Sequence, residues 1–180
     1  DIGCGTGKYL KELAPLAKTY TGLDVSLEQL KIAKKKSKKA KFVCASAENT
    51  GLLTESYDVI ISCWALSTIL SLTKRRKAIK EAQRVLRKKG SIYLVENAVG
   101  GEFEQIRGRY PDPKMRTKKT NDWYEKQGFK PIKKCNSYFE FKSLKEAKTI
   151  IEGIWGSKAA LKVKNKRIKH KIVIFKKINS

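Results

Sequence analysis

The sequence has few of the residues that build metal and disulfide sites. Its 180 residues include only 4 Cys and 1 His. The cysteines lie far apart, with no C-x-x-C pair, at Cys4, Cys44, Cys63 and Cys135. These spacings exclude the familiar zinc motifs and provide no disulfide framework, so they indicate a reducing, cytoplasmic location.

Long apolar runs and acidic residues are also scarce. Because no run of about 18 apolar residues occurs, the sequence predicts no membrane span. Only 17 residues are Asp or Glu against 41 Lys or Arg, which gives a formal net charge of +24. Such a basic surface can bind nucleic-acid phosphates. However, 33 of the cations are Lys and they are spread along the chain, which favours a solvated surface over a dedicated nucleic-acid site.

The first residues of the chain combine an acidic residue with alternating glycines, at Asp1, Gly3, Gly5 and Gly7. Glycine permits positive φ angles and removes the Cβ atoms that would hold a ligand away from the backbone. We therefore expect a strand end, a tight turn, and a helix starting near Thr6 whose free N–H groups point at a ligand.

A second acidic residue follows at the end of the next predicted strand. Asp24 comes nineteen positions after Gly5. A carboxylate at this place can accept hydrogen bonds from both hydroxyls of a ribose. Ser26 and Gln29 then match a capping box, with Gln29 reaching back to Ser26, and predict a helix over residues 27–36.

The motif Asp1-x-Gly3-x-Gly5-x-Gly7, followed by Asp24, resembles motif I of the class I S-adenosylmethionine-dependent methyltransferases. The resemblance is strong over roughly the first hundred residues. It implies an α/β fold with a Rossmann-like doubly wound, mostly parallel sheet and an antiparallel last strand. Since a central strand of the family ends where Asp1 stands, we expect a truncated gene product that lacks most of the first strand, with a single methyltransferase domain over residues 1–180.

The resemblance also implies S-adenosylmethionine as the cofactor. Residues 42–49 resemble the strand and loop that hold the adenine, with Ser46 where many relatives have Asp. The apolar run at residues 57–62 is typical of a buried parallel strand, and residues 63–66 resemble the loop near the methionine end, where Trp64 either flanks the methyl group or is a core aromatic. The implied cofactor-binding residues are Asp1, Gly3, Cys4, Gly5, Gly7, Asp24, Val25, Ser46, Ala47, Glu48 and Ser62.

The remaining elements follow from hydrophobic periodicity, caps and turn residues. Helices are expected over residues 74–86, 102–108, 120–127 and 143–154, strands over 91–97, 129–141 and 172–175, and a turn over 110–113.

The sequence identifies no catalytic residue. A sulfonium methyl group is already activated, so the protein needs mainly to align an acceptor and exclude water. Glu96 and Asn97 follow a predicted strand, where open α/β sheets bind ligands, and are candidates for substrate contact. His170 is expected to be exposed or to cap a strand rather than to act as a general base.

The leading hypothesis is a methyltransferase acting on a small molecule, without a metal and without a membrane partner. The Asn/Asp-Pro-Pro-Tyr and Pro-Cys motifs of nucleic-acid base methylation are absent from the sequence. Two alternatives stay open. One is an RNA methyltransferase, for example on a tRNA base, that uses the lysine surface; the other is a non-catalytic cofactor-binding module.

Overall fold

A computed structural model of the protein describes residues 1–107 and 113–179, which form two compact units. Unit 1 contains Asp1–Val95 and the end of the chain from Lys176, and unit 2 contains Glu96–Phe175. The predicted turn over residues 110–113 lies largely outside the described residues. The expectation of a single domain stays a prediction.

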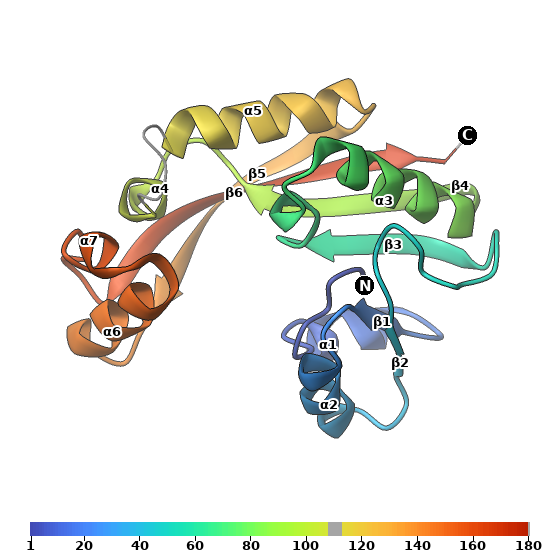
Figure 1. The fold of residues 1–180 in the computed structure, drawn as a ribbon, viewed down its shortest axis with the longest axis horizontal. Coiled ribbons are helices and arrows are strands. Elements are labelled where there is room, and N and C mark those ends of the chain that lie inside the picture. Colours follow the sequence, from blue (N-terminus) through green and yellow to red (C-terminus); the bar gives the residue numbers. More distant parts are fainter. Residues whose placement is uncertain (108–112, 180) are drawn as a thin grey trace. The chain divides into compact units, whose positions relative to one another are not determined.

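The first strands of unit 1 are parallel and joined by a helix (Figure 1). The strands are β1 (Thr21–Asp24) and β2 (Lys41–Cys44), and the helix that connects them is α2 (Leu27–Lys36). The N-cap of α2 is Ser26, whose Oγ accepts from the Gln29 N–H at 3.3 Å. The predicted helix bounds are therefore confirmed. The predicted return bond from Gln29 is wrong, because the Ser26 N–H donates to the Asp24 carboxylate instead, at 2.9 Å.

The first three residues pair with strands on both sides. Ile2 bridges in parallel to Leu23 of β1, and its N–H donates to the Ile61 carbonyl at 2.8 Å. Ile61 belongs to β3 (Tyr57–Cys63). This short segment therefore occupies the position of the central strand. Val59, in the first half of β3, is more than half exposed. The expected burial of this strand therefore holds only for its second half.

The helix after the glycine turn is shorter than the sequence suggests. It comprises α1 (Leu10–Leu13) and the 3₁₀ turn η1 (Ala14–Leu16), whereas residues from Thr6 to Tyr9 form turns. The start predicted near Thr6 is wrong because Gly7 has a φ of +68°, which an α-helix does not accommodate.

Unit 1 continues through a well-formed amphipathic helix. After the 3₁₀ turn η2 (Leu66–Thr68) come α3 (Leu72–Val85) and β4 (Leu86–Asn97), with β4 parallel to β3. Helix α3 buries one apolar face, comprising Ala78, Ile79, Ala82 and Val85. The chain turns directly from this helix into β4, so Leu86, expected at the end of the helix over residues 74–86, is the first residue of the strand.

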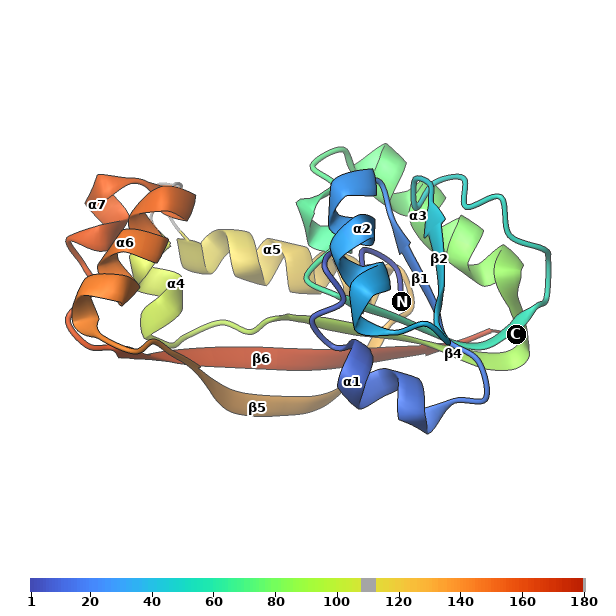
Figure 2. The same ribbon diagram turned by 90° about the horizontal axis from the view of Figure 1, so that it is seen from below.

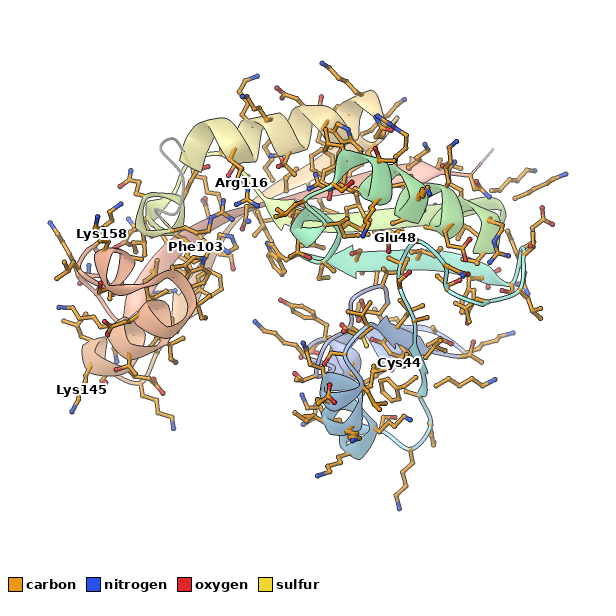
Figure 3. All side chains as sticks on the ribbon, viewed as in Figure 1. Cys44, Glu48, Phe103, Arg116, Lys145 and Lys158 are labelled. Carbon is orange, nitrogen blue, oxygen red and sulfur yellow. The ribbon has the colours of Figure 1, made fainter. Side chains whose placement is uncertain are left out.

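Unit 2 has its own apolar core. Its elements are α4 (Glu102–Ile106), α5 (Pro113–Lys126), β5 (Lys130–Glu140), α6 (Leu144–Trp155), α7 (Ser157–Ala160) and β6 (Arg167–Ile178). Helices α6 and α7 lie side by side (Figures 1 and 2). The core groups Phe103, Ile106, Ala147, Ile151, Ala159, Val163 and Ile168. On the outside, Lys145 and Lys158 point away from the ribbon (Figure 3).

The strand order confirms the predicted fold class. Strands follow the order β3-β4-β6-β5, and β4 and β6 contribute residues to both units. The Ala98 N–H donates to the Lys171 carbonyl, and the Asn179 N–H donates to the Gly90 carbonyl. These hydrogen bonds show that β6 runs antiparallel to β4. The fold is an α/β sheet of parallel and antiparallel strands.

Within the described residues no helix is long and apolar enough to cross a bilayer. The same part of the chain contains no group of three or more His, Cys, Asp or Glu side chains placed to hold a metal ion.

Hydrogen bonds to the Glu81 carboxylate connect the loop before β3 to α3. Glu81 accepts from the Thr50 N–H at 3.0 Å and hydroxyl at 2.7 Å, and from the Arg84 guanidinium at 2.7 Å. The Arg84 hydrogen bonds, followed by those of Thr50, lower the pKa of Glu81 to about 2. Because the folded-state pKa lies below the unfolded value, this contribution is present above about pH 4.5 and is lost as pH falls toward 2.

We expect Glu81→Gln to lower the free energy of unfolding at pH 7 by about 1.5–3 kcal/mol, the usual loss for hydrogen bonds to a charged group. Urea unfolding at pH 7 and pH 3 measures it, with Glu152→Gln on the exposed side of α6 as the matched control. The difference in free energy of unfolding between wild type and Glu81→Gln should be smaller at pH 3 than at pH 7. A difference that stays constant would show that the Glu81 carboxylate charge contributes nothing.

Candidate functional site

Unit 1 contains a cavity of about 720 Å³ at the carboxyl ends of β1 and β2, here called the glycine-loop cavity. Its wall comes from the glycine turn, the residues that follow the two strands, the first turn of α2, and the segment from Cys63 to Lys74. The volume lies within the range of about 300–1,000 Å³ typical of small-molecule sites.

Two glycines let the backbone border this cavity. Gly3 has a φ of +73°, and a Cβ added there would lie 2.1 Å from the Cβ of Ala65. Gly5 has a φ of +54°, and its added Cβ would lie 2.8 Å from Oε1 of Gln29. Both positions therefore favour glycine for conformation, and Gly3 also requires it for space, whereas the Gln29 side chain can move away from Gly5.

Asp24 connects the glycine turn to the start of α2. Its Oδ2 accepts from the Gly5 N–H and its Oδ1 accepts from the Ser26 N–H, both at 2.9 Å. A carboxylate has about four acceptor sites, so each oxygen keeps capacity for a further donor. Asp24 thus fixes the turn and also presents an acceptor pair to the cavity that it lines.

The cysteine in the turn is not a nucleophile. Cys4 is only 7% exposed, and burial together with the nearby negative charge of Asp24 raises the pKa of its thiol to about 11. The thiol is therefore protonated at neutral pH. Its sulfur fills the space above Gly22, where an added Cβ would lie 2.8 Å from Sγ, so Cys4 is a packing residue.

Trp64 lines the cavity with a strained backbone. Its φ is +53°, which is unusual for a bulky side chain, and its N–H donates to the Val95 carbonyl at 2.9 Å. The indole also meets the ring of Tyr9, with centroids 6.1 Å apart. Backbone strain of this kind concentrates at functional sites. The position of Trp64 therefore favours the interpretation as a site residue over that as a core aromatic.

The structure brings together part of the predicted cofactor set. Six of those residues line the cavity: Gly3, Gly5, Asp24, Val25, Ala47 and Glu48. Three of the other five make contacts elsewhere in unit 1. Ser62 donates its hydroxyl to the Ile2 carbonyl at 3.0 Å, Asp1 accepts from the Tyr20 hydroxyl at 2.6 Å, and Gly7 faces Ala33 of α2.

Ser46 lies between two lining residues without lining the cavity itself, and its carbonyl accepts from the Asn49 N–H. Sequence reasoning missed Gln29 as a lining residue and the lining residues from Thr68 to Lys74. The one available signal was Ser71, which caps α3 by accepting from the Lys74 N–H at 3.3 Å.

The two candidates for substrate contact lie in unit 2. Glu96 is 2% exposed and accepts from the Tyr124 hydroxyl at 3.1 Å, while Asn97 Oδ1 is 2.7 Å from Nε2 of His170. Of the two expectations for His170, exposure is wrong, because the side chain is 4% exposed and packs against the rings of Phe103 and Phe139. Substrate contact by Glu96 and Asn97 stays a prediction.

Residues 1–94, which include the complete glycine-loop cavity, match the family described as methyltransferase domain. The chain belongs to this family. This methyltransferase domain is 32% identical over 158 residues to an uncharacterized protein of Methanocaldococcus jannaschii, covering 82% of the chain and 57% of that protein. It is 33% identical over 99 residues to a demethylmenaquinone methyltransferase of Thermotoga maritima, covering 53% of the chain and 42% of that enzyme.

A solved structure shares the fold of this methyltransferase domain. A SAM-dependent methyltransferase from Methanosarcina mazei has a TM-score of 0.67 at 21% identity, and the match covers 100% of this chain and 92% of that one. The chain spans only about half the length of the two relatives matched by sequence.

Proposed function

We propose that this methyltransferase domain binds S-adenosylmethionine in the glycine-loop cavity and transfers the methyl group to a small-molecule acceptor. The proposal rests mainly on one observation. Gly3, Gly5 and Asp24 line the same cavity, and a hydrogen bond from the Gly5 N–H to Asp24 Oδ2 holds the glycine turn against the carboxylate. When bound, the cofactor supplies a methyl group already activated by the positive charge on sulfur.

The lining residues fit such a cofactor. Asp24 would accept hydrogen bonds from the ribose hydroxyls, since each of its oxygens has a remaining acceptor site. Val25 and Ala47 offer apolar surface for a base. Gly3 and Gly5 line the cavity with backbone atoms alone, so the ligand would contact the backbone there. Each of these roles uses a different part of the cofactor, so the fit does not depend on one contact.

The protein's own contribution to transfer is alignment. A cavity that holds donor and acceptor in one geometry converts a bimolecular reaction into an effectively unimolecular one. The apolar residues Leu66, Ile69 and Leu70 line the same cavity and would exclude water from an acceptor. No proton-transferring residue is assigned.

A small-molecule acceptor is supported by the relative named for demethylmenaquinone, which is a small organic molecule. The RNA alternative gains no support from the relatives described above, and its only argument is the basic composition.

Transfer of a labelled methyl group tests the proposal. The purified protein is incubated with methyl-labelled S-adenosylmethionine, a metabolite extract and total RNA, and the labelled products are then separated by size. We expect label in the small-molecule fraction. Label in RNA would favour the RNA methyltransferase, and cofactor binding without any transfer would favour the non-catalytic module.

A further inference from the structure

Unit 1 contains a second cavity, of about 450 Å³, here called the basic groove. It is lined by residues of α1 and η1, by the residues that precede β1, and by the loop between α2 and β2. Thr19 and Tyr20 lead into β1, and Ala40 leads into β2. The groove therefore lies at the amino ends of the two parallel strands, whereas the glycine-loop cavity lies at their carboxyl ends.

The charged residues that line the groove are all lysines. Its charged lining residues are Lys11, Lys18, Lys36, Lys39 and Lys41, and no Asp or Glu is among the residues that line it. Helix α2 ends at the groove, and a helix C-terminus carries about half a negative charge. Five positive charges outweigh that half charge several-fold, so the groove attracts anions.

Apolar residues line the groove beside the lysines. Leu10, which is buried, Ala14, Pro15 and Ala40 are here called its floor, and the five lysines its rim. A lining that combines apolar residues with cations matches a ligand that has both an apolar body and an anionic group.

A hydroxyl donor lies on the same wall. Ser37 Oγ accepts from the N–H groups of Lys39 at 3.2 Å and Ala40 at 3.3 Å. Both acceptor sites of this oxygen are thus used, which leaves its hydrogen to donate. The wall therefore offers a neutral donor next to the lysine ammonium groups, as phosphate recognition requires.

We infer that the basic groove binds a small phosphorylated organic molecule, of the size and chemistry of a nucleoside monophosphate. The volume suits one such ligand, the lysines and Ser37 would bind the phosphate, and the apolar floor would receive the base or another flat apolar body. Ligands of open α/β sheets usually bind at the carboxyl ends of the strands. This site at the opposite ends is therefore separate from the proposed cofactor site and does not depend on it.

Calorimetric titration tests the groove. The purified protein, saturated with S-adenosylhomocysteine and held at about 150 mM salt to screen distant charges, is titrated with uridine monophosphate, uridine, inorganic phosphate and an RNA oligonucleotide. A pyrimidine ligand avoids competition for an adenine site. The groove variant is Lys18→Gln/Lys39→Gln/Lys41→Gln, and the matched control is Lys133→Gln/Lys134→Gln/Lys142→Gln, which removes the same charge from exposed positions in unit 2.

We expect the monophosphate to bind more tightly than phosphate or uridine alone, because it engages both rim and floor. Affinity should fall about tenfold or more in the groove variant, a loss that corresponds to ~1.4 kcal/mol, and less than about twofold in the control. All proteins should show the same thermal unfolding midpoint, since the changed lysines are exposed. Equal losses in groove and control variants, or no binding by wild type, would overturn the inference. Binding only of an RNA oligonucleotide would also overturn it, in favour of a nucleic-acid surface.

Discussion

Gly3→Ala should abolish cofactor binding and destabilise unit 1. The added methyl group would lie 2.1 Å from the Cβ of Ala65, a distance at which the glycine turn and the loop after β3 must separate. The φ of +73° adds the cost of a left-handed conformation. Together, overpacking and the left-handed backbone should lower the free energy of unfolding by about 2–5 kcal/mol. Binding of S-adenosylhomocysteine should weaken about a hundredfold or more, as this loop forms the cavity wall.

Gly51→Ala is the matched control for this substitution. Gly51 has nearly the same φ, +67°, but nothing lies within 4 Å of an added Cβ. The control therefore carries the conformational cost without the collision, about 1–2 kcal/mol, and should leave ligand affinity unchanged. Urea unfolding and calorimetry measure both variants. If Gly3→Ala and Gly51→Ala lose the same free energy of unfolding and bind S-adenosylhomocysteine equally well, the close approach of Gly3 to the loop after β3 has no role in the site.

Asp24→Ala should weaken binding of S-adenosylhomocysteine by about 1.5–3 kcal/mol, the range for lost hydrogen bonds to a charged group. The substitution removes the acceptor pair proposed for the ribose and also releases the N–H groups of Gly5 and Ser26. Asp24→Asn separates these effects, because its one carbonyl oxygen can still accept from one of the two N–H groups. We expect Asn to recover more of the stability than of the affinity.

Asp58→Ala serves as the control for charge. Asp58 is an exposed carboxylate on β3, paired with Arg87 at 2.7 Å, and does not line the cavity. An exposed ion pair contributes about 0–1 kcal/mol, so this variant should bind as wild type does. Affinity unchanged in Asp24→Ala would contradict the role assigned to Asp24, whereas equal loss in Asp58→Ala would show a general effect of charge.

Local signals explain why much of the fold could be predicted. Ser26 and Ser143 each cap a helix by accepting the N–H three residues on, so α2 and α6 begin where the sequence indicates. The glycines at positions 3, 5 and 7 all have positive φ, as alternating glycines suggest. These features depend on neighbours within a few residues.

Tertiary contacts explain what the sequence did not reveal. His170 stands in a lysine-rich stretch and looks solvent-facing, yet Phe103 and Phe139 pack against it from positions far along the chain. Asp24 takes the N–H that the capping pattern assigned to Gln29, because the glycine turn places the carboxylate there. The basic groove likewise draws its lysines from three segments, none of which has a recognisable motif alone.

Titration of the purified protein with S-adenosylhomocysteine and with NAD tests the central claim most directly. The proposed glycine-loop site predicts one bound S-adenosylhomocysteine per chain with a dissociation constant on the order of micromolar, about −8 kcal/mol, and no comparable binding of NAD. Tight binding of NAD, or no binding of S-adenosylhomocysteine by a protein that unfolds cooperatively, would contradict the assignment of the glycine-loop cavity.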